Sequence, residues 1–331
     1  MQRVILTALL AYVIALVIAP FVMKWLRKLK FGQTIYDLGP ESHKKKQGTP
    51  TMGGVIFTVP ALIAAVVMAR NDTRFSWLLI VLVSTVGFGL IGFIDDFIKV
   101  KLKRSLGLTP IQKMVPQFVL SVGLAIWAYA RADIGSSLTV PFLNIEWNLG
   151  WFYIPVMVFV MVGTVNSANL LDGLDGLCGS VSLIDFATMA IICVLLAAKQ
   201  PDNASNLLNT AILSAAMCGG LMGFLHYNDH PAAVFMGDIG AFLIGGALVG
   251  VCLVTRLSLL LPIIALAMLL STVSDLIQFA YFRATHGKRI FKMAPLHHHF
   301  EKCGMPETKI LIMYYSVTIL LCLMAVLGFI A

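Results

Sequence analysis

The sequence predicts an all-α polytopic membrane protein with about ten transmembrane helices, and three observations carry this prediction. The residues AVILMFWYC make up 59% of the 331-residue chain. Counting Gly in place of Tyr raises the apolar share to about 65%, against roughly 45–50% in soluble domains. Only 12% of the residues are charged. Uncharged runs also recur, and the run from Trp77 to Ile94 would cover roughly 27 Å as a helix, close to the hydrocarbon thickness of a bilayer.

Ten apolar runs of spanning length can be placed in order along the chain. They lie near residues 4–23, 52–69, 76–94, 112–130, 151–170, 178–198, 207–225, 237–255, 258–282 and 309–330. The first run is too long for a cleaved signal peptide, so we interpret it as a retained span. Residues 136–150 alternate apolar and polar side chains, which predicts a short outer β-hairpin. No linker or repeat divides the chain, and we expect one membrane domain over residues 1–331.

The positive charges predict the orientation of these spans. Three quarters of the 24 lysines and arginines fall in the loops that follow the first, third and ninth runs. The positive-inside rule places those loops in the cytoplasm and both termini outside. The net charge of +8 is therefore explained by topology within a lipid bilayer, and it does not indicate a nucleic-acid partner.

Five segments with unusual polar residues fall on this predicted cytoplasmic face. They are residues 43–51, 95–99, 166–175, 226–238 and 294–301. A transporter or channel would distribute charged groups through the depth of the bilayer, whereas here almost all acids lie at one surface. The pattern therefore favours an enzyme with an interfacial active site over a transporter.

Two adjacent carboxylates, Asp95 and Asp96, stand where an apolar run meets a basic segment. At the water boundary a carboxylate avoids most of the cost of membrane burial and can meet a metal or an ionised ligand. Asp95 shares a helical face with Lys99, four residues later. Asp96 points about 100° away from Asp95 on a helix, so the two carboxylates are expected to have different roles.

The segment 166–176 is rich in amides and acids. Asn166, Asn169, Asp172 and Asp175 follow one another at intervals of three residues. On a continuous helix these four groups would line one wall of a site. The alternative is a capped helix end, because Asp and Gly favour turns.

Asp238 lies between glycines at the beginning of an apolar span. It is either an N-cap or part of a ligand site, because glycine lets a ligand approach the backbone and a helix N-terminus suits a metal-bound phosphate. Asn228, just upstream, would add a neutral oxygen ligand or a phosphate donor. Acidic loops without thiolates favour a hard cation, most plausibly Mg²⁺ with a diphosphate.

The remaining polar positions have several interpretations. Three consecutive histidines, His297, His298 and His299, cannot easily direct their rings to one ion, so sugar or phosphate hydrogen bonding is favoured over zinc, with a solvated turn as the alternative. Lys46 and Thr51 lie where a phosphate bound at the interface would be neutralised by basic groups. The ninth run contains polar residues that are expected to face the bundle interior. They are Ser271, Thr272, Ser274, Asp275 and Gln278.

Taken together, these motifs resemble the polyprenyl-phosphate N-acetylhexosamine-1-phosphate transferase family over essentially the whole chain. Asp95-Asp96, the Asn-Leu-x-Asp-Gly-Leu-Asp-Gly run at 169–176 and Gly237-Asp238 are similar to its signatures, and residues 43–54 and 295–301 resemble its muramoyl-pentapeptide branch. The resemblance implies Mg²⁺-dependent transfer of phospho-N-acetylmuramoyl-pentapeptide from its UDP derivative to undecaprenyl phosphate, giving lipid I and UMP. It also implies a homodimer in the bacterial cell membrane. The nearest alternative is a sibling enzyme that uses UDP-N-acetylglucosamine, and the histidine motif argues against it.

The resemblance also assigns residues. Asp95, Asp96 and Asp238 are the implied catalytic residues, with Asp238 as the metal ligand. The implied substrate-binding residues are Lys46, Thr51, Lys99, Asn166, Asn169, Asp172, Asp175, Asn228, Gln278, His297, His298 and His299. Ile239 and Ala241 depart from the family pattern, in which small hydroxylated residues are expected, and this argues against a hydroxyl in the metal shell.

Two mechanisms remain open at this point. In the favoured one the lipid phosphate attacks directly, and Asp95 orients it or removes a residual proton. In the other, an aspartate forms a covalent phospho-sugar intermediate.

Overall fold

The computed structural model describes residues 1–28, 48–69, 76–102, 107–143 and 145–330, which form an almost entirely helical bundle. The first half contains α1 (Gln2–Lys28), α3 (Val55–Met68), α4 (Ser76–Lys101), α5 (Pro110–Tyr129), β1 (Ser137–Val140), β2 (Ile145–Asn148) and α6 (Tyr153–Leu171). The second half contains α7 (Leu177–Lys199), α8 (Ala204–Asn228), α9 (Gly237–Val254), α10 (Leu261–Ile264), α11 (Leu266–Ala284), α12 (Leu296–Lys302) and α13 (Glu307–Ile330).

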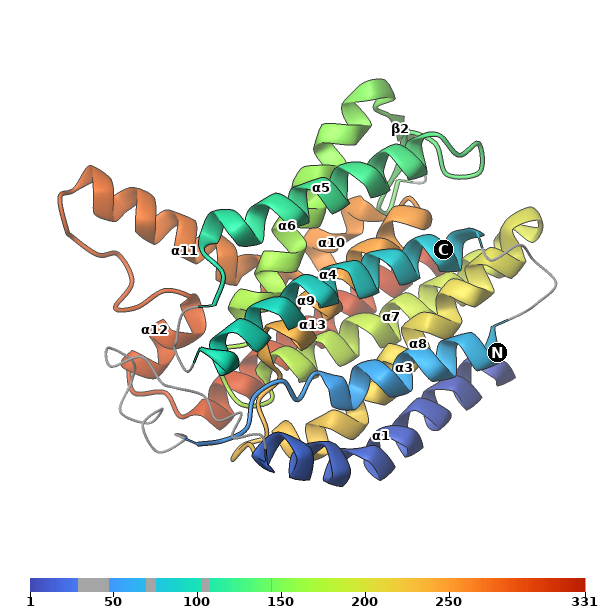
Figure 1. Cartoon of the computed structure of the whole chain (residues 1–331). Helices are drawn as coiled ribbons and strands as arrows, with labels where there is room; N and C mark the ends of the chain where they lie inside the picture. Colours follow the sequence, from blue (N-terminus) through green and yellow to red (C-terminus); the bar gives the residue numbers. More distant parts are fainter. Residues whose placement is uncertain (29–47, 70–75, 103–106, 144, 331) are drawn as a thin grey trace.

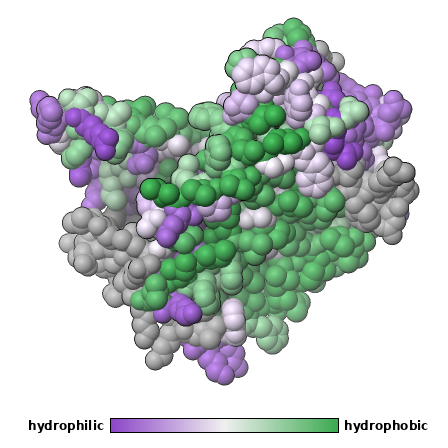
Figure 2. Space-filling model, turned by 45° about the horizontal axis from the view of Figure 1, so that its top comes forward, coloured by the Kyte–Doolittle hydropathy of each residue, from purple (hydrophilic) through white to green (hydrophobic). Residues whose placement is uncertain are grey.

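The prediction of an all-α polytopic membrane protein is confirmed. Within the described residues, eight helices are long and apolar enough to span a membrane, or nine if the bent pair of α10 and α11 is one span. Each predicted run corresponds to helix, although the run at 52–69 contains only the 14-residue α3. Figure 2 shows a broad hydrophobic surface across the bundle, with hydrophilic residues gathered toward its margins.

The ninth run departs from a simple span. Its helix breaks at Ala265, and the two parts are bent by 84°. α11 therefore projects away from the other helices (Figure 1). Ser271 and Ser274 are buried as expected, but Asp275 is exposed. The expectation that every polar residue of this run faces the bundle interior is wrong for Asp275, because the bend carries that part of α11 away from the bundle.

The central helices are α8 and α9. In the most apolar 18-residue stretch of each helix, 83% of the residues are buried in α8 and 89% in α9. The corresponding share is 28% in α1 and in α5. Close helix packing in membranes depends on small residues, because lipid is as apolar as the side chains it contacts. At Gly92 of α4 a Cβ atom would collide with the carbonyl oxygen of Asp238 on α9. Gly92 therefore allows the end of α4 to contact the beginning of α9.

The predicted hairpin at 136–150 is confirmed. β1 and β2 pair antiparallel, with Ser137 opposite Asn148 and Val140 opposite Ile145. In Figure 1 the two termini lie at one end of the bundle, and α12 lies at the other. The polar segments singled out in the sequence gather at the α12 end, where α4, α6 and α8 end and α5, α7 and α9 begin.

Candidate active site

A cluster of carboxylates and ammonium groups joins α4, α5 and α9. Lys99 Nζ lies 2.6 Å from Asp95 Oδ2 and 3.0 Å from Asp238 Oδ2. Lys113 Nζ lies 3.0 Å from Asp95 Oδ2 and 2.8 Å from Asp238 Oδ2. Asp95 is fully buried and also accepts a hydrogen bond of 2.7 Å from the backbone N–H of Leu108. The predicted contact of Asp95 with Lys99 across one helical turn is confirmed, and the two lysines bridge carboxylates on different helices.

Asp96 shares Lys99 with its neighbour, at 3.5 Å from Asp96 Oδ1, but also contacts the beginning of α9. Its Oδ2 accepts a hydrogen bond of 3.0 Å from the backbone N–H of Ile239, in the first turn of α9. Gly237, which begins this helix, has a φ of +76°, a conformation that glycine adopts without a Cβ penalty. A Cβ at Gly237 would also lie 2.5 Å from Asp96 Oδ2. Asp96 thus holds the beginning of α9 in place and lies at the edge of the cluster, whereas Asp95 contacts both ammonium groups.

The donor set of this cluster suits a hard divalent cation. Asp95, Asp96 and Asp238 each offer a carboxylate oxygen, and these oxygens lie within 4.8 Å of one another. Oxygen ligands of this kind are those that Mg²⁺ prefers in proteins. Three carboxylates with Lys99 and Lys113 leave one net negative charge. The residues present therefore fit the predicted metal, and Asp238, whose side chain is 14% exposed, is the most accessible of the three acids.

α5 contributes a residue that the sequence analysis did not select. Thr109 caps this helix in a capping box with Gln112, and Pro110 occupies the first turn. This local start places Lys113 at the carboxylate cluster. Lys113 and Gln117 are four residues apart in a mostly apolar helix, so they share a face. This spacing of two polar residues is the feature of the sequence that could have identified Lys113 as a site residue, whereas its positive charge alone indicates only membrane orientation.

The two asparagines of α6 line the same region. Asn169 Nδ2 donates a hydrogen bond of 2.9 Å to Asp238 Oδ1, so the predicted approach of these segments is observed. Asn166 lies one turn earlier, where its Nδ2 donates to Gln117 Oε1 at 2.7 Å. Asn169 therefore orients the carboxylate of Asp238, while Asn166 ties α6 to α5.

The continuous helical wall expected from Asn166 to Asp175 is wrong in its second half. α6 ends at Leu171, and Asp172 is its C-cap residue. Asp175 instead accepts a hydrogen bond of 3.1 Å from the backbone N–H of Ala232 and lies 3.3 Å from His230 Nδ1. Burial, followed by the negative charges of Asp238, Asp96 and Asp175, raises the pKa of Asp172 to about 8. The turn-forming alternative, in which Asp and Gly end the helix, describes this segment correctly.

Two predicted substrate-binding amides are engaged by backbone groups. Asn228 Oδ1 accepts from Gly176 N at 3.1 Å, and its Nδ2 donates to Val234 O at 2.9 Å. Gln278 Nε2 donates to Phe291 O at 3.0 Å, and its Oε1 accepts from the N–H groups of Ile290 and Phe291. These contacts hold the loops around the cluster, and direct substrate contact by either residue stays a prediction.

Two of the three histidines of the short helix α12 contact each other, since the rings of His297 and His298 meet edge-on with their centroids 4.3 Å apart. His297 is fully buried, and a Cβ at Gly173 in the acidic loop would collide with its Nε2. His298 Nδ1 lies 3.2 Å from Glu301 Oε2. His299 Nδ1 accepts a hydrogen bond of 3.0 Å from the backbone N–H of Lys292. His297 and His298 thus face the acidic loop together, whereas His299 faces Lys292 and Phe291, which agrees with the expectation that the three rings do not all share one ion.

Of the predicted polar segment at residues 43–51, the structure describes only residues 48–51. Lys46 lies outside the described residues. Thr51 is half-buried beside the beginning of α9, where its Oγ1 would be 3.0 Å from a Cβ at Gly237. Backbone N–H groups of Gly53 and Gly54 donate to Phe235 O and Met236 O, both at 2.8 Å. These bonds hold the residues around Thr51 against the glycine turn that precedes Asp238.

Comparison with protein families gives two matches. Residues 78–256 match the family described as Glycosyl transferase family 4, a range that includes α4 to α9 and all the carboxylates of the cluster. Residues 46–57 match Phospho-N-acetylmuramoyl-pentapeptide-transferase signature 1. The second match covers the segment that packs against the beginning of α9.

Full-length relatives carry the same name. The chain is 43% identical over 322 residues to the phospho-N-acetylmuramoyl-pentapeptide-transferase of Clostridioides difficile, covering 97% of this chain and 96% of the relative. It is 43% identical over 319 residues to that of Caldanaerobacter subterraneus, covering 96% of each chain. It is 41% identical over 328 residues to that of Halalkalibacterium halodurans, covering 98% of each. Identity at this level over the whole length, together with the carboxylate cluster, means that the chain is a membrane-embedded glycosyl-1-phosphate transferase and belongs to the phospho-N-acetylmuramoyl-pentapeptide-transferase family.

Proposed function

We propose that this enzyme transfers phospho-N-acetylmuramoyl-pentapeptide from its UDP derivative to undecaprenyl phosphate, giving lipid I and UMP in an Mg²⁺-dependent reaction. The observation that carries the proposal is the convergence of three carboxylates and two lysines at one end of an apolar bundle. A transfer between two phosphorylated substrates must bring negative charges together, and such a cluster supplies groups that offset them. The names of the full-length relatives support phospho-N-acetylmuramoyl-pentapeptide as the group that is transferred.

Individual residues receive roles from their positions. Asp238 holds the metal, with Asp95 and Asp96 beside it. When bound there, Mg²⁺ would neutralise the diphosphate and polarise its oxygens. Lys99 and Lys113 stay close enough to the metal ligands to contact phosphate oxygens of either substrate. Asn169 keeps the Asp238 carboxylate in one orientation through its hydrogen bond to Oδ1.

The contacts of Asp95 favour direct attack by the lipid phosphate over a covalent intermediate. The Asp95 carboxylate is fully buried and is engaged by Lys99, Lys113 and the N–H of Leu108. A nucleophile must present a free lone pair to phosphorus, and these contacts oppose that. The second pKa of a phosphomonoester is near 6, so most of the lipid phosphate is a dianion at pH 7 and needs no strong base. Asp95 then orients the acceptor phosphate through the lysines.

We place this reaction on the cytoplasmic face of the bacterial cell membrane, in one domain that spans the chain. Support comes from the lysine-rich segments at the α12 end of the bundle, because positive residues collect in cytoplasmic loops. The family resemblance also leads us to propose a homodimer. The mass of the detergent-solubilised protein, measured by light scattering, tests that assembly.

The decisive experiment is a reconstituted assay. Purified protein is incubated with undecaprenyl phosphate, Mg²⁺ and either UDP-N-acetylmuramoyl-pentapeptide or UDP-N-acetylglucosamine, and UMP release is measured. UMP formation with the muramoyl substrate alone supports the proposal. Turnover of UDP-N-acetylglucosamine in its place identifies the sibling activity, and the absence of UMP with both substrates contradicts a transferase role.

A further inference from the structure

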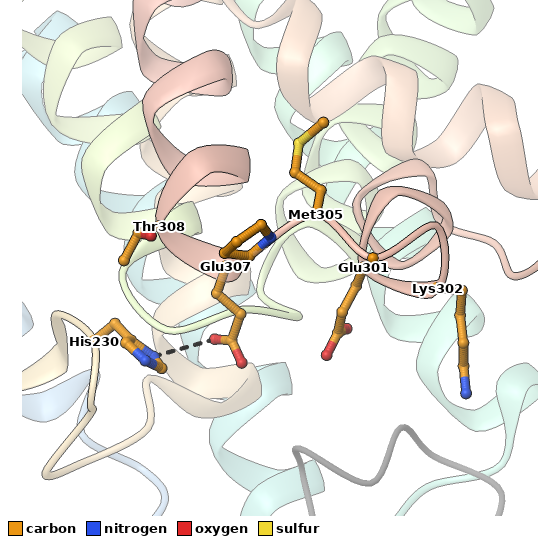
Figure 3. A pocket seen from close by; sticks show the side chains of 8 residues that line it. His230, Glu301, Lys302, Met305, Glu307 and Thr308 are labelled. Carbon is orange, nitrogen blue, oxygen red and sulfur yellow. Dashed lines mark ion pairs between the residues drawn. The ribbon is translucent and has the colours of Figure 1, made fainter.

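A hollow lies where α12 meets α13. It is a cavity of about 450 Å³. Its walls include His230, Glu301, Lys302, Met305 and Glu307 (Figure 3). None of these residues has a role in the proposed phosphoryl transfer, so the cavity requires its own explanation.

The charged groups around this cavity differ in their partners. His230 Nδ1 lies 3.3 Å from Glu307 Oε2 (Figure 3), and Glu301 Oε2 lies 3.2 Å from His298 Nδ1. The exposed ammonium of Lys302, in contrast, forms no ion pair or hydrogen bond with any residue in the described parts of the chain. A ligand entering this cavity therefore meets two engaged carboxylates and one cation that is available for an anion.

The cavity is connected to the acidic loop of the active site. The same His230 Nδ1 lies 3.3 Å from Asp175 Oδ2, and Asp175 also accepts from the N–H of Ala232. Asp175 is three residues from Asp172, whose carboxyl senses the charges of Asp238 and Asp96. Through His230, the cavity therefore borders the acidic loop that follows α6.

The lining indicates the chemical class of the ligand. Met305 and Pro306 provide aliphatic surface, and His230 is the only aromatic residue among those that line the cavity. A nucleobase would have only this one ring, already engaged with carboxylates, to stack on, and a diphosphate would face two carboxylates and one lysine. A short chain with small side chains and a single terminal carboxylate matches the aliphatic surface and the one available cation.

We propose that this cavity binds the C-terminal end of the peptide carried by the sugar nucleotide, with Lys302 pairing with its terminal carboxylate. This inference rests on the proposed function, which supplies a pentapeptide attached to the sugar. A peptide that is joined to a muramoyl group through its N-terminus ends in a free carboxylate. Lys302 is thus a specificity-determining residue that acts in binding and takes no part in the chemical step.

The test compares the natural substrate with an analogue whose terminal carboxylate is a carboxamide. In the wild type, the carboxamide should have a KM roughly fivefold higher, as expected for loss of one partly exposed charge pair, with kcat unchanged. In Lys302→Gln the two substrates should have equal KM values, whereas Lys302→Arg should restore the preference for the carboxylate. Lys288→Gln is the matched control, because that lysine is in the same basic region and does not line the cavity; it should keep the wild-type ratio.

Two further measurements exclude other occupants. Met305→Trp, which fills the cavity, should raise KM for both substrates, and inhibition by UMP should be the same in the wild type and in Lys302→Gln. A Lys302→Gln enzyme that still prefers the carboxylate overturns the proposal, as does one with weakened UMP inhibition, which would place the nucleotide in the cavity. Failure of the wild type to release UMP from either substrate contradicts the proposed function instead, so the two failures are distinguishable.

Discussion

Replacing Gly92 by Ala adds one methyl group at the closest contact between α4 and α9. The added Cβ would lie 2.5 Å from the carbonyl carbon of Asp238 and 2.8 Å from the nitrogen of Ile239, and it would collide with the Asp238 carbonyl oxygen. Cβ contacts below 3.0 Å essentially do not occur. To restore ordinary carbon contacts of about 3.5 Å, the two helices must separate locally by roughly 1 Å.

That separation acts directly on the carboxylate cluster. Asp95 lies one turn after Gly92 on α4, and the clash is with the residue that carries the Asp238 carboxylate on α9. Misplacement of catalytic groups by 1 Å can cost about 100-fold in rate. Overpacking typically costs about 1–3 kcal/mol in stability, and the better helix propensity of Ala offsets up to about 1 kcal/mol of this. We therefore expect Gly92→Ala to fold, to melt at a lower temperature and to lose about two orders of magnitude in kcat.

The assay is UMP release by protein in detergent, with thermal unfolding of the same preparations. Gly163→Ala on α6 is the matched control, because a Cβ at that position meets nothing within 4 Å. It should keep kcat, and its melting temperature should stay the same or rise, because Ala favours helix more than Gly does. A Gly92→Ala enzyme with the wild-type kcat would refute the reasoning, since it would mean that the contact between α4 and α9 does not set the geometry of the cluster.

The other predictions concern single carboxylates. Asp238→Ala should lose at least about 1,000-fold in kcat and need more Mg²⁺ for any residual turnover, because it removes the most accessible oxygen ligand; unchanged Mg²⁺ dependence in a titration contradicts the metal assignment. Asp95→Asn should keep measurable turnover that improves from pH 6 to 8, as the lipid phosphate ionises. A dead mutant, with wild-type UMP release in the absence of lipid, favours the covalent route. Asp172 has a pKa of about 8 in the folded protein and near 4 when unfolded. Between these values the folded state holds a proton that the unfolded state has lost, so stability falls as pH rises. In metal-free buffer the melting temperature of the wild type should therefore drop from pH 5 to 8 relative to Asp172→Asn, and parallel profiles would contradict this.

The sequence by itself determined the membrane architecture, because hydropathy and side-chain periodicity are local properties. It was sufficient to place a helix in each of the ten apolar runs and a hairpin within residues 136–150, although it did not predict α12 or the break between α10 and α11. The contact of Asp95 with Lys99 was also predictable, since it follows from the spacing of one helical turn.

Only the tertiary structure decided which charged groups meet. Lys99 and Lys113 reach Asp238 from 139 and 125 residues away in the sequence, so no local pattern reports these contacts. The approach of Gly92 to Asp238 depends on how two helices pack. The position of His230 beside Glu307, and the bend that leaves Asp275 exposed, likewise depend on how separate elements are arranged. Hydrophobic pattern specifies that a helix crosses the membrane, but the contacts among helices specify which side chains its end presents to a neighbour.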